Sequence, residues 1–421
     1  MSPLLLGTSI FVLTYALIAS EKIDKMIAAL AGGLVMILVG IISQEQAFEH
    51  IDFNVIFLLA GMMILAGIIR KTGVFGWLAI RAARLAGGEP YRILVVLCVI
   101  TAVASALLDN VTTVVLVGPI TLFLAARLGL SPVPFLIGEI LASNIGGAAT
   151  LIGDPPNILI GSAANLDFVA FLSNMLPVSV VCLGLFLVAA RWMFRRHFAV
   201  DPDLRAALLD LDEREMITHP ELLRKSLIVL GLTLAGFLFH GILHLEPATI
   251  ALVGAVALML VAREDPAEVL QEVEWPTLFF FIGLFMLVAG VIEVGLIEVL
   301  AEAAVSLTGG DTAATAMLLL WLSGILSGVV DNIPYTATMI PVVQQLSEGQ
   351  DSDVLWWSLA LGADLGGNAT IIGASANVIL VNLAAREGHR IGFWQFLKYG
   401  LLVTVGSLLV STVYIWLRYL L

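Results

Sequence analysis

Long apolar runs alternate with short polar stretches along the whole chain. Runs such as 4–19, 27–42, 55–69, 226–243 and 278–292 carry few charges. Each is about as long as a helix must be to cross the hydrocarbon core of a bilayer. This pattern predicts an all-α polytopic membrane protein whose helices contact the lipid bilayer.

The composition agrees with that prediction. Of the 421 residues, 60% are hydrophobic and only 13% are charged, whereas soluble domains average about 45–50% apolar and about 25% charged residues. The net charge of −13 offers no basic surface for a nucleic acid. Cys98 and Cys182 lie in separate apolar runs, so we expect two buried thiols and neither a disulfide framework nor a metal motif.

The apolar pattern predicts ten full crossings. They are 3–19, 24–42, 53–69, 131–164, 168–194, 225–243, 247–262, 276–292, 354–385 and 393–417. Paired glycines interrupt 131–164 and 354–385, so we expect both to be broken helices. Two further segments, 92–127 and 313–346, turn back at an Asp-Asn pair. We interpret each as a re-entrant hairpin, although two short spans in each would leave the topology unchanged.

The basic residues predict the orientation. On this map nineteen of the twenty Lys and Arg residues fall on one side, and only Arg418 falls on the other. Basic residues near helix ends stay cytoplasmic. Both termini are therefore expected outside, in a plasma (inner) membrane. The amphipathic segment 74–86 is expected along the inner membrane surface.

The second half of the chain repeats motifs of the first. Segment 51–73 aligns with 273–295, and "SNIGGAATLIGDPPN" (143–157) aligns with "ADLGGNATIIGASAN" (363–377). We therefore expect a first repeat at 1–195, a cytoplasmic linker at 196–224 and a second repeat at 225–421. Five crossings per repeat, an odd number, invert the second copy. Inverted repeats with broken helices are typical of secondary transporters, whose site lies between the repeats near the midplane.

Polar positions at the hairpin tips and helix breaks are the candidate substrate- or ion-binding residues. In the first repeat they are Asp109, Asn110, Thr112, Asn144, Gly146, Gly147, Thr150, Asp154 and Asn157. In the second repeat they are Asp331, Asn332, Asp364, Gly366, Gly367, Asn368, Thr370 and Asn377. Irregular backbone within a membrane is tolerated where it lines a cavity or packs in protein, so these stretches predict a central cavity.

Four carboxylates, Asp109, Asp154, Asp331 and Asp364, are expected within the membrane, with Glu139 as a less central fifth. No Lys or Arg is expected at that depth. Carboxylates without basic partners hold protons or bind cations, so Asp109, Asp331 and Asp364 are candidates for a sodium site. For Asp109, Asp154 and Asp331 the alternative is that each only caps a helix N-terminus. No cofactor is expected.

The motifs "LDNVTT", "SNIGGAATLIGDPPN", "VDNIPYTATMIP" and "LGGNATIIGASAN" resemble the ion transporter superfamily, specifically its arsenite permease and NhaD-type sodium–proton antiporter group. Among relatives they look most like the P-protein family. The resemblance implies two hairpins and two broken helices around a central site, and a homodimer. Dicarboxylate carriers of this superfamily carry Ser-Asn-Thr at corresponding tips. Asp-Asn-Val-Thr here disfavours a citrate or succinate carrier.

The leading functional prediction is export of arsenite or antimonite driven by the proton gradient. Arsenite is mainly an uncharged hydroxide at neutral pH, so amides, threonines and carboxylates could hold it without a basic residue. A sodium–proton antiporter is the close alternative, favoured by the unpaired acids, and a P-protein-like anion (chloride) pathway is the third.

The motifs disfavour a self-contained pump and an enzyme, and they leave a channel open. The absence of a Gly-x-x-x-x-Gly-Lys loop argues against a self-contained pump, and no catalytic grouping indicates an enzyme. A cytoplasmic ATPase subunit remains a possible partner. The sequence does not distinguish a transporter from a channel.

Overall fold

The computed structural model describes residues 2–20, 22–195, 202–209, 212–348 and 353–421. These residues form helices and no strand, so the predicted all-α fold is confirmed. The first half contains α1 (Pro3–Ser20), α2 (Lys25–Leu38), α3 (Gln44–Glu49), α4 (Phe53–Arg70), α5 (Val74–Leu85), α6 (Pro90–Leu107), α7 (Asn110–Arg127), α8 (Val133–Gly147), α9 (Pro155–Ala164), α10 (Phe168–Asn174) and α11 (Leu176–Phe194).

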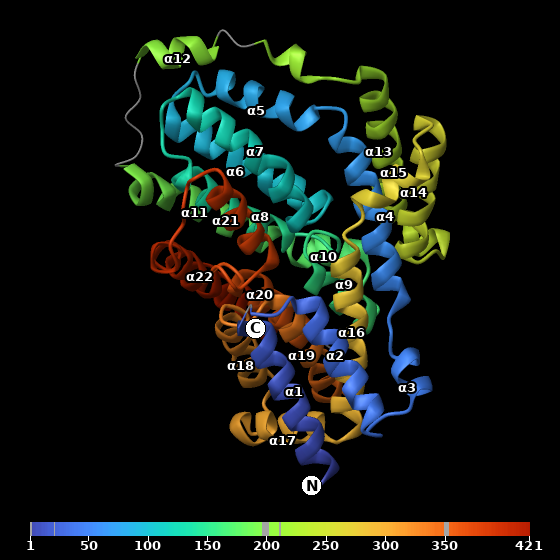
Figure 1. The fold of residues 1–421 in the computed structure, drawn as a ribbon. Coiled ribbons are helices and arrows are strands. Elements are labelled where there is room, and N and C mark those ends of the chain that lie inside the picture. The colour runs from blue at the N-terminus through green and yellow to red at the C-terminus, as the bar shows by residue number, and fades with distance from the viewer. Residues whose placement is uncertain (1, 21, 196–201, 210–211, 349–352) are drawn as a thin grey trace.

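The linker contributes α12 (Pro202–Leu209) and the 3₁₀ turn η2 (Glu213–Met216). The second half contains α13 (Pro220–Leu243), α14 (Pro247–Ala262), α15 (Pro266–Val269), η3 (Leu270–Glu272), α16 (Trp275–Glu293), α17 (Leu296–Thr308), α18 (Thr312–Ser327), α19 (Asn332–Ser347), α20 (Val354–Gly366), α21 (Ser375–Arg386), α22 (Phe393–Ile415) and the π-helical turn η4 (Trp416–Leu420). The same order of elements therefore recurs on both sides of the linker (Figure 1).

Eight helices among the described residues are long and apolar enough to cross a membrane. α2, α8, α14 and α20 are apolar but shorter. Both expected helix breaks are present, between α8 and α9 and between α20 and α21. The segment 168–194 differs from its prediction as one crossing, because it is divided at Met175 into α10 and α11. The hairpin arms α6 and α7 are 18 residues each, longer than the short arms we expected.

The breaks form where paired glycines let the chain pass very close to itself. A Cβ atom on Gly147 would lie 2.6 Å from the carbonyl oxygen of Gly153, and one on Gly373 would lie 2.7 Å from that of Gly367. No real Cβ fits at such a distance. In the first half, Pro155 and Pro156 then start α9, where a missing N–H costs nothing. The chain thus leaves α8 and re-enters a helix within a few residues.

Matching contacts relate the two halves. Both arms of the α6–α7 hairpin contact α5, and both arms of the α18–α19 hairpin contact α17. α2 packs on α16 as α14 packs on α4. Figure 1 shows α5 and α17 at opposite ends of the molecule. An inverted repeat would produce this arrangement, although the inversion itself and the division at 195 and 225 stay predictions.

The linker is bound to the end of the molecule where α5 lies. Glu213 of η2 accepts a hydrogen bond from Arg81 at 3.0 Å and pairs with Arg84. The Arg84 guanidinium holds the pKa of the Glu213 carboxyl below its usual value. Thr218 donates its backbone N–H to the carbonyl oxygen of Thr72 at 3.1 Å. The described residues of the linker are thus partly helical; 196–201 and 210–211 lie outside the described residues.

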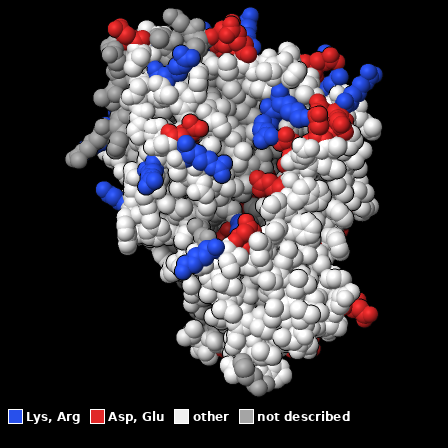
Figure 2. Space-filling model, in the orientation of Figure 1, with Lys and Arg blue, Asp and Glu red and all other residues white. Residues whose placement is uncertain are grey.

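Figure 2 shows Lys and Arg from the end of α5 and α12 down to the middle part of the face drawn, and none near the lower end. This distribution agrees with a cytoplasmic linker. We therefore expect a Ser306→Cys variant to react with an impermeant thiol reagent in whole cells, and an Ala206→Cys variant to react only after permeabilisation. Ser306 and Ala206 are exposed, whereas the native Cys98 and Cys182 are buried and give little background. The opposite labelling would overturn the charge argument.

Candidate functional site

The hairpin-tip aspartates both cap helices, as the capping alternative predicted. Asp109 accepts hydrogen bonds from the backbone N–H and the hydroxyl of Thr112, at 2.7 and 2.6 Å. Asp331 accepts one from the backbone N–H of Ile333 at 3.1 Å. Capping does not complete their environment, because both carboxylates also line one pocket.

This pocket, which we call the central pocket, has a volume of about 320 Å³. It lies where the N-terminal ends of α2, α7, α9, α16, α19 and α21 meet. Its polar lining consists of Asp24, Lys25, Asp109, Glu274, Thr277, Asp331, Ser375 and Asn382. Four carboxylates face one ammonium group, so the pocket is acidic. The partial positive charge of helix N-termini offsets only part of this negative charge.

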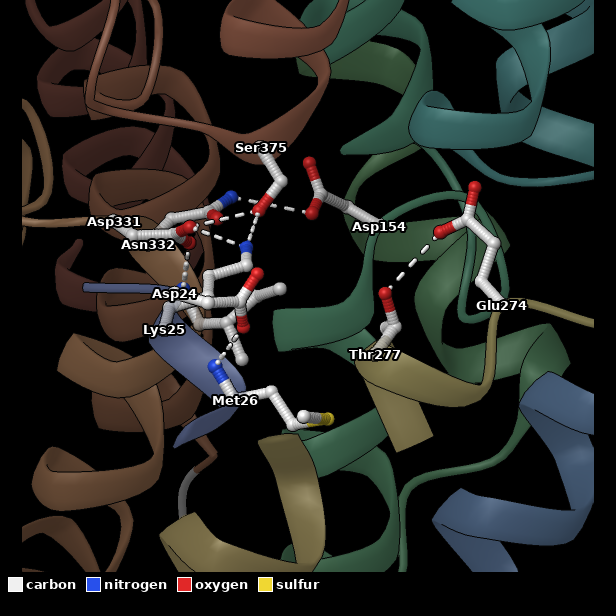
Figure 3. Close-up of polar contacts among 10 residues, drawn as sticks. Asp24, Lys25, Met26, Asp154, Glu274, Thr277, Asp331, Asn332 and Ser375 are labelled. Atoms are coloured by element: carbon white, nitrogen blue, oxygen red, sulfur yellow. Dashed lines mark hydrogen bonds and ion pairs between the residues drawn. The ribbon is translucent and has the colours of Figure 1, made fainter. Parts of the chain in front are cut away.

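Lys25 makes the one ion pair that the described residues form with a central acid. Its Nζ lies 3.0 Å from Oδ2 of Asp331 and donates to the hydroxyl of Ser375 (Figure 3). Ser375 in turn donates to Asp331 at 2.7 Å. The expectation that no basic residue reaches the central acids is therefore wrong. The turn between α1 and α2 carries Lys25 to the caps of α19 and α21, instead of leaving it at the membrane surface.

Asp154 forms a second, fully buried polar group together with asparagines. It accepts hydrogen bonds from the side-chain amides of Asn110 at 2.7 Å and Asn332 at 3.2 Å. It precedes α9 but makes no side-chain capping bond. The capping alternative is thus wrong for Asp154. Its carboxylate joins the two hairpin tips, one from each half of the chain, and Figure 3 shows the contact with Asn332.

Amide groups connect the two helix breaks directly. Asn144 of α8 donates to the side-chain oxygens of Asn368 at 3.0 Å and Asn377 at 2.9 Å. The amide of Asn110 also lies 3.4 Å from the side-chain oxygen of Asn144. The two contacts of Asn144 with Asn368 and Asn377 span more than 200 residues of sequence, so candidate residues of both halves contact one another at the breaks.

Asp364 of α20 is fully buried, and neither carboxylate oxygen accepts a hydrogen bond of good geometry from the described residues. Asn157 lies beside it, and its side-chain oxygen also has no described partner. Asp364 is close enough to Asp154 for the two carboxyl groups to interact electrostatically. A buried charge without a partner is costly, so a bound proton or cation is expected to complete this site.

Other candidate residues hold the backbone of the breaks. Thr150 and Thr370 donate to the carbonyl oxygens of Ala106 and Gly328, at 2.6 and 2.7 Å. Asn157 and Asn377 donate to backbone carbonyls within their own breaks, those of Thr150 and Thr370, at 3.0 and 2.9 Å. Gly146, Gly147, Gly366 and Gly367 allow close backbone approach.

Only some of the acidic candidates line the central pocket. Asp109 and Asp331 line it, whereas Asp154 and Asp364 do not. Glu139 also lies away from it and accepts a hydrogen bond from Thr121. Among the described residues no three His, Cys, Asp or Glu side chains form a group that could hold a metal ion. The three aspartates proposed for sodium therefore do not form one cage.

The helical fold, the two broken helices and the buried polar centre define a multi-pass membrane transporter. The family described as citrate transporters matches residues 15–362, and the chain belongs to this family. It is 44% identical to a "46 kDa membrane protein" of Mycobacterium leprae, over 99% of both chains. It is 46% identical to an uncharacterised transporter of Mycobacterium tuberculosis, over 98% of both.

Two more distant similarities extend this picture. The chain is 33% identical to the human P protein, over 97% of this chain and 59% of that protein. The expected P-protein resemblance is thereby confirmed, while the narrower arsenite permease and NhaD-type assignment stays a prediction. The fold is similar to the crystal structure of the Alcanivorax borkumensis YdaH transporter, with a TM-score of 0.59 and 14% identity over 100% and 99% of the two chains.

Proposed function

We propose that this chain is a secondary active transporter of the plasma membrane that exchanges protons for a small monovalent cation, with sodium as the first candidate. The observation that carries the proposal is the pair of fully buried carboxylates, Asp154 and Asp364, one from each half and neither with a described basic partner. Such groups can take up and release a proton, and a membrane interior favours their neutralisation.

The charge of the central pocket favours a cation over an anion. Asp24, Asp109, Glu274 and Asp331 face it, and the single ammonium of Lys25 is already paired. Citrate or chloride would have to bind among these carboxylates without a free cationic group. The family name therefore does not decide the substrate here, and a P-protein-like anion pathway is less well supported by this geometry.

Arsenite export, the leading prediction from sequence, receives less support. An uncharged hydroxide needs free amide or hydroxyl donors, and most of the central amide donors are engaged with each other, with Asp154 or with backbone carbonyls. A homodimer and a docked cytoplasmic ATPase also stay predictions. None of these features is required by cation–proton exchange.

The test is proton movement in proteoliposomes that contain the purified protein and a pH-sensitive dye. A proton gradient is imposed, and sodium, arsenite or chloride is then added in separate samples. We expect sodium alone to move protons, since only a cation suits the acidic pocket. Proton movement with arsenite alone would instead support the permease, and movement with chloride alone would support the anion pathway.

A further inference from the structure

We infer that the ammonium group of Lys25 holds the place of the transported cation at Asp331 and Ser375, and that it must leave before the cation binds there. This inference rests on the proposed cation–proton exchange. It assigns the cation a contact site, and it gives Lys25 the role of a tethered competitor for that site.

The position of Lys25 does not stabilise the helix to which it belongs. Lys25 is the first residue of α2, where the positive end of the helix dipole disfavours a cation. Its side chain reaches instead to the N-terminal ends of α19 and α21, where it contacts Asp331 and Ser375. Its side chain is 32% exposed and that of Asp331 is 9% exposed. The ammonium therefore lies between the buried carboxylate and the pocket.

The atoms around this ammonium suit a small hard cation. A carboxylate oxygen and a hydroxyl oxygen both contact Nζ, and oxygen atoms are the ligands that hard cations prefer. Replacing one cation by another keeps Asp331 neutralised throughout. The exchange avoids leaving the buried carboxylate without a compensating charge, which is costly in a protein interior.

The released ammonium has other acids nearby. Asp109 lies on the wall of the same pocket, and Glu274 is within electrostatic range of Lys25. Asp24 is the residue before it, and the hydroxyl of Tyr15 lies within electrostatic range of Asp331. Lys25 can thus leave Asp331 without leaving the acidic pocket, which makes displacement by an incoming cation feasible.

A second pocket lies in the equivalent register of the repeat and has no lysine at the position of Lys25, although Asp109, the counterpart of Asp331, lines the central pocket instead. This second pocket, of about 470 Å³, is lined by His240, Gly241, Glu246, Pro247, Ile158 and Ser162, among others. With the spacings of the internal repeat, these correspond to Ile18, Ala19, Asp24, Lys25, Val378 and Asn382 of the central pocket.

Proline stands at the positions equivalent to Lys25 and Ser375, the two residues whose side chains contact Asp331. Pro247 corresponds to Lys25, and Pro155 corresponds to Ser375. Asp109, the counterpart of Asp331, forms no ion pair within the described residues. The repeated architecture therefore does not require a lysine here. Lys25 in the first half and Ser375 in the second half are thus not repeated at their equivalent positions, as expected of a feature that acts on a single acid.

The experiment measures sodium binding by the thermal stability of purified full-length protein in detergent, at increasing sodium concentration. Removing the competitor strengthens sodium binding, so Lys25→Met is expected to lower the half-saturating sodium concentration by about tenfold, equal to about 1.4 kcal/mol. Lys25→Arg keeps the charge and is expected to stay near wild type. Lys22→Met is the matched control, because Lys22 lies exposed on the same turn.

Transport gives the second measurement. In proteoliposomes, Lys25→Met is expected to slow sodium-driven proton movement although sodium binds more tightly, because no ammonium neutralises Asp331 on the return step. A merely structural role would weaken binding and transport together. If Lys25→Met does not fold, Lys25→Gln still donates a hydrogen bond to Asp331 without a charge and is expected to show the same tighter binding.

An unchanged or higher half-saturating sodium concentration in either variant would overturn the role of Lys25. That result is distinct from failure of the proposed function. In the latter case the wild-type protein itself would show neither stabilisation by sodium nor sodium-driven proton movement.

Discussion

Replacing Asp154 by asparagine is expected to reduce sodium-driven proton movement to the background of empty liposomes while the protein keeps its fold. Asparagine has nearly the same shape, and its side-chain oxygen can still accept hydrogen bonds from Asn110 or Asn332. It cannot carry a proton in exchange for a cation. The measurement is dye-reported internal pH, with thermal stability recorded on the same preparation.

The control for this variant is Asp311→Asn. Asp311 caps α18 through the backbone N–H of Ala314 at 2.8 Å, is exposed, lies outside the buried group and both pockets, and is replaced by another good capping residue. It is expected to transport like wild type. Wild-type proton movement in Asp154→Asn would show that the carboxylate only joins the two hairpin tips, and would leave Asp364 as the single candidate proton carrier.

The second large effect is expected on stability. In Gly146→Ala, the new Cβ would lie 2.2 Å from the carbonyl oxygen of Ala102 and 2.4 Å from its Cα. Both contacts are with backbone of α6, which cannot rotate away. Separation of α6 from α8 would follow, with a cost of about 1–3 kcal/mol or more, as for other overpacked interiors. A lower melting temperature and a lower yield of folded protein are the measured results.

Gly184→Ala is the matched control, because Gly184 lies within α11 and a Cβ there meets nothing within 4 Å. Alanine favours helix over glycine by about 1 kcal/mol, so this variant is expected to be as stable as wild type or slightly more stable. Equal melting temperatures for the two variants would contradict the close α6–α8 approach.

The fold was largely predictable because its signals are local. Apolar length gave the helices, and the paired glycines of 143–157 and 363–377 gave both breaks. The tips at Asp109 and Asp331 were found from the repeated Asp-Asn pair. The division at Met175 was missed because hydropathy stays high across it, and only Pro177, near the start of α11, marks a new helix.

The partners at the site could not be predicted in the same way. Counting basic residues to predict topology places Lys25 at the nearest helix end. Such a count cannot predict that the turn before α2 brings Lys25 to an acid that is distant in sequence. The different environments of Asp154 and Asp364 depend on which asparagine reaches them across the two halves. The sequence contained one signal of this contact. Lys25 lies at the start of a helix, where the helix dipole disfavours a cation, and such a lysine is expected to have an acidic partner elsewhere.

The two pockets occupy equivalent positions in the internal repeat. The central pocket reaches Asp331 and Asp109, whereas the second pocket ends beside Ser162 and His240. If the two halves exchange their conformations, we expect the second pocket to deepen toward Asp109 and the central pocket to close. The same repeated elements would then form both the entrance and the exit of the transport path, and turnover would need no hinge outside them.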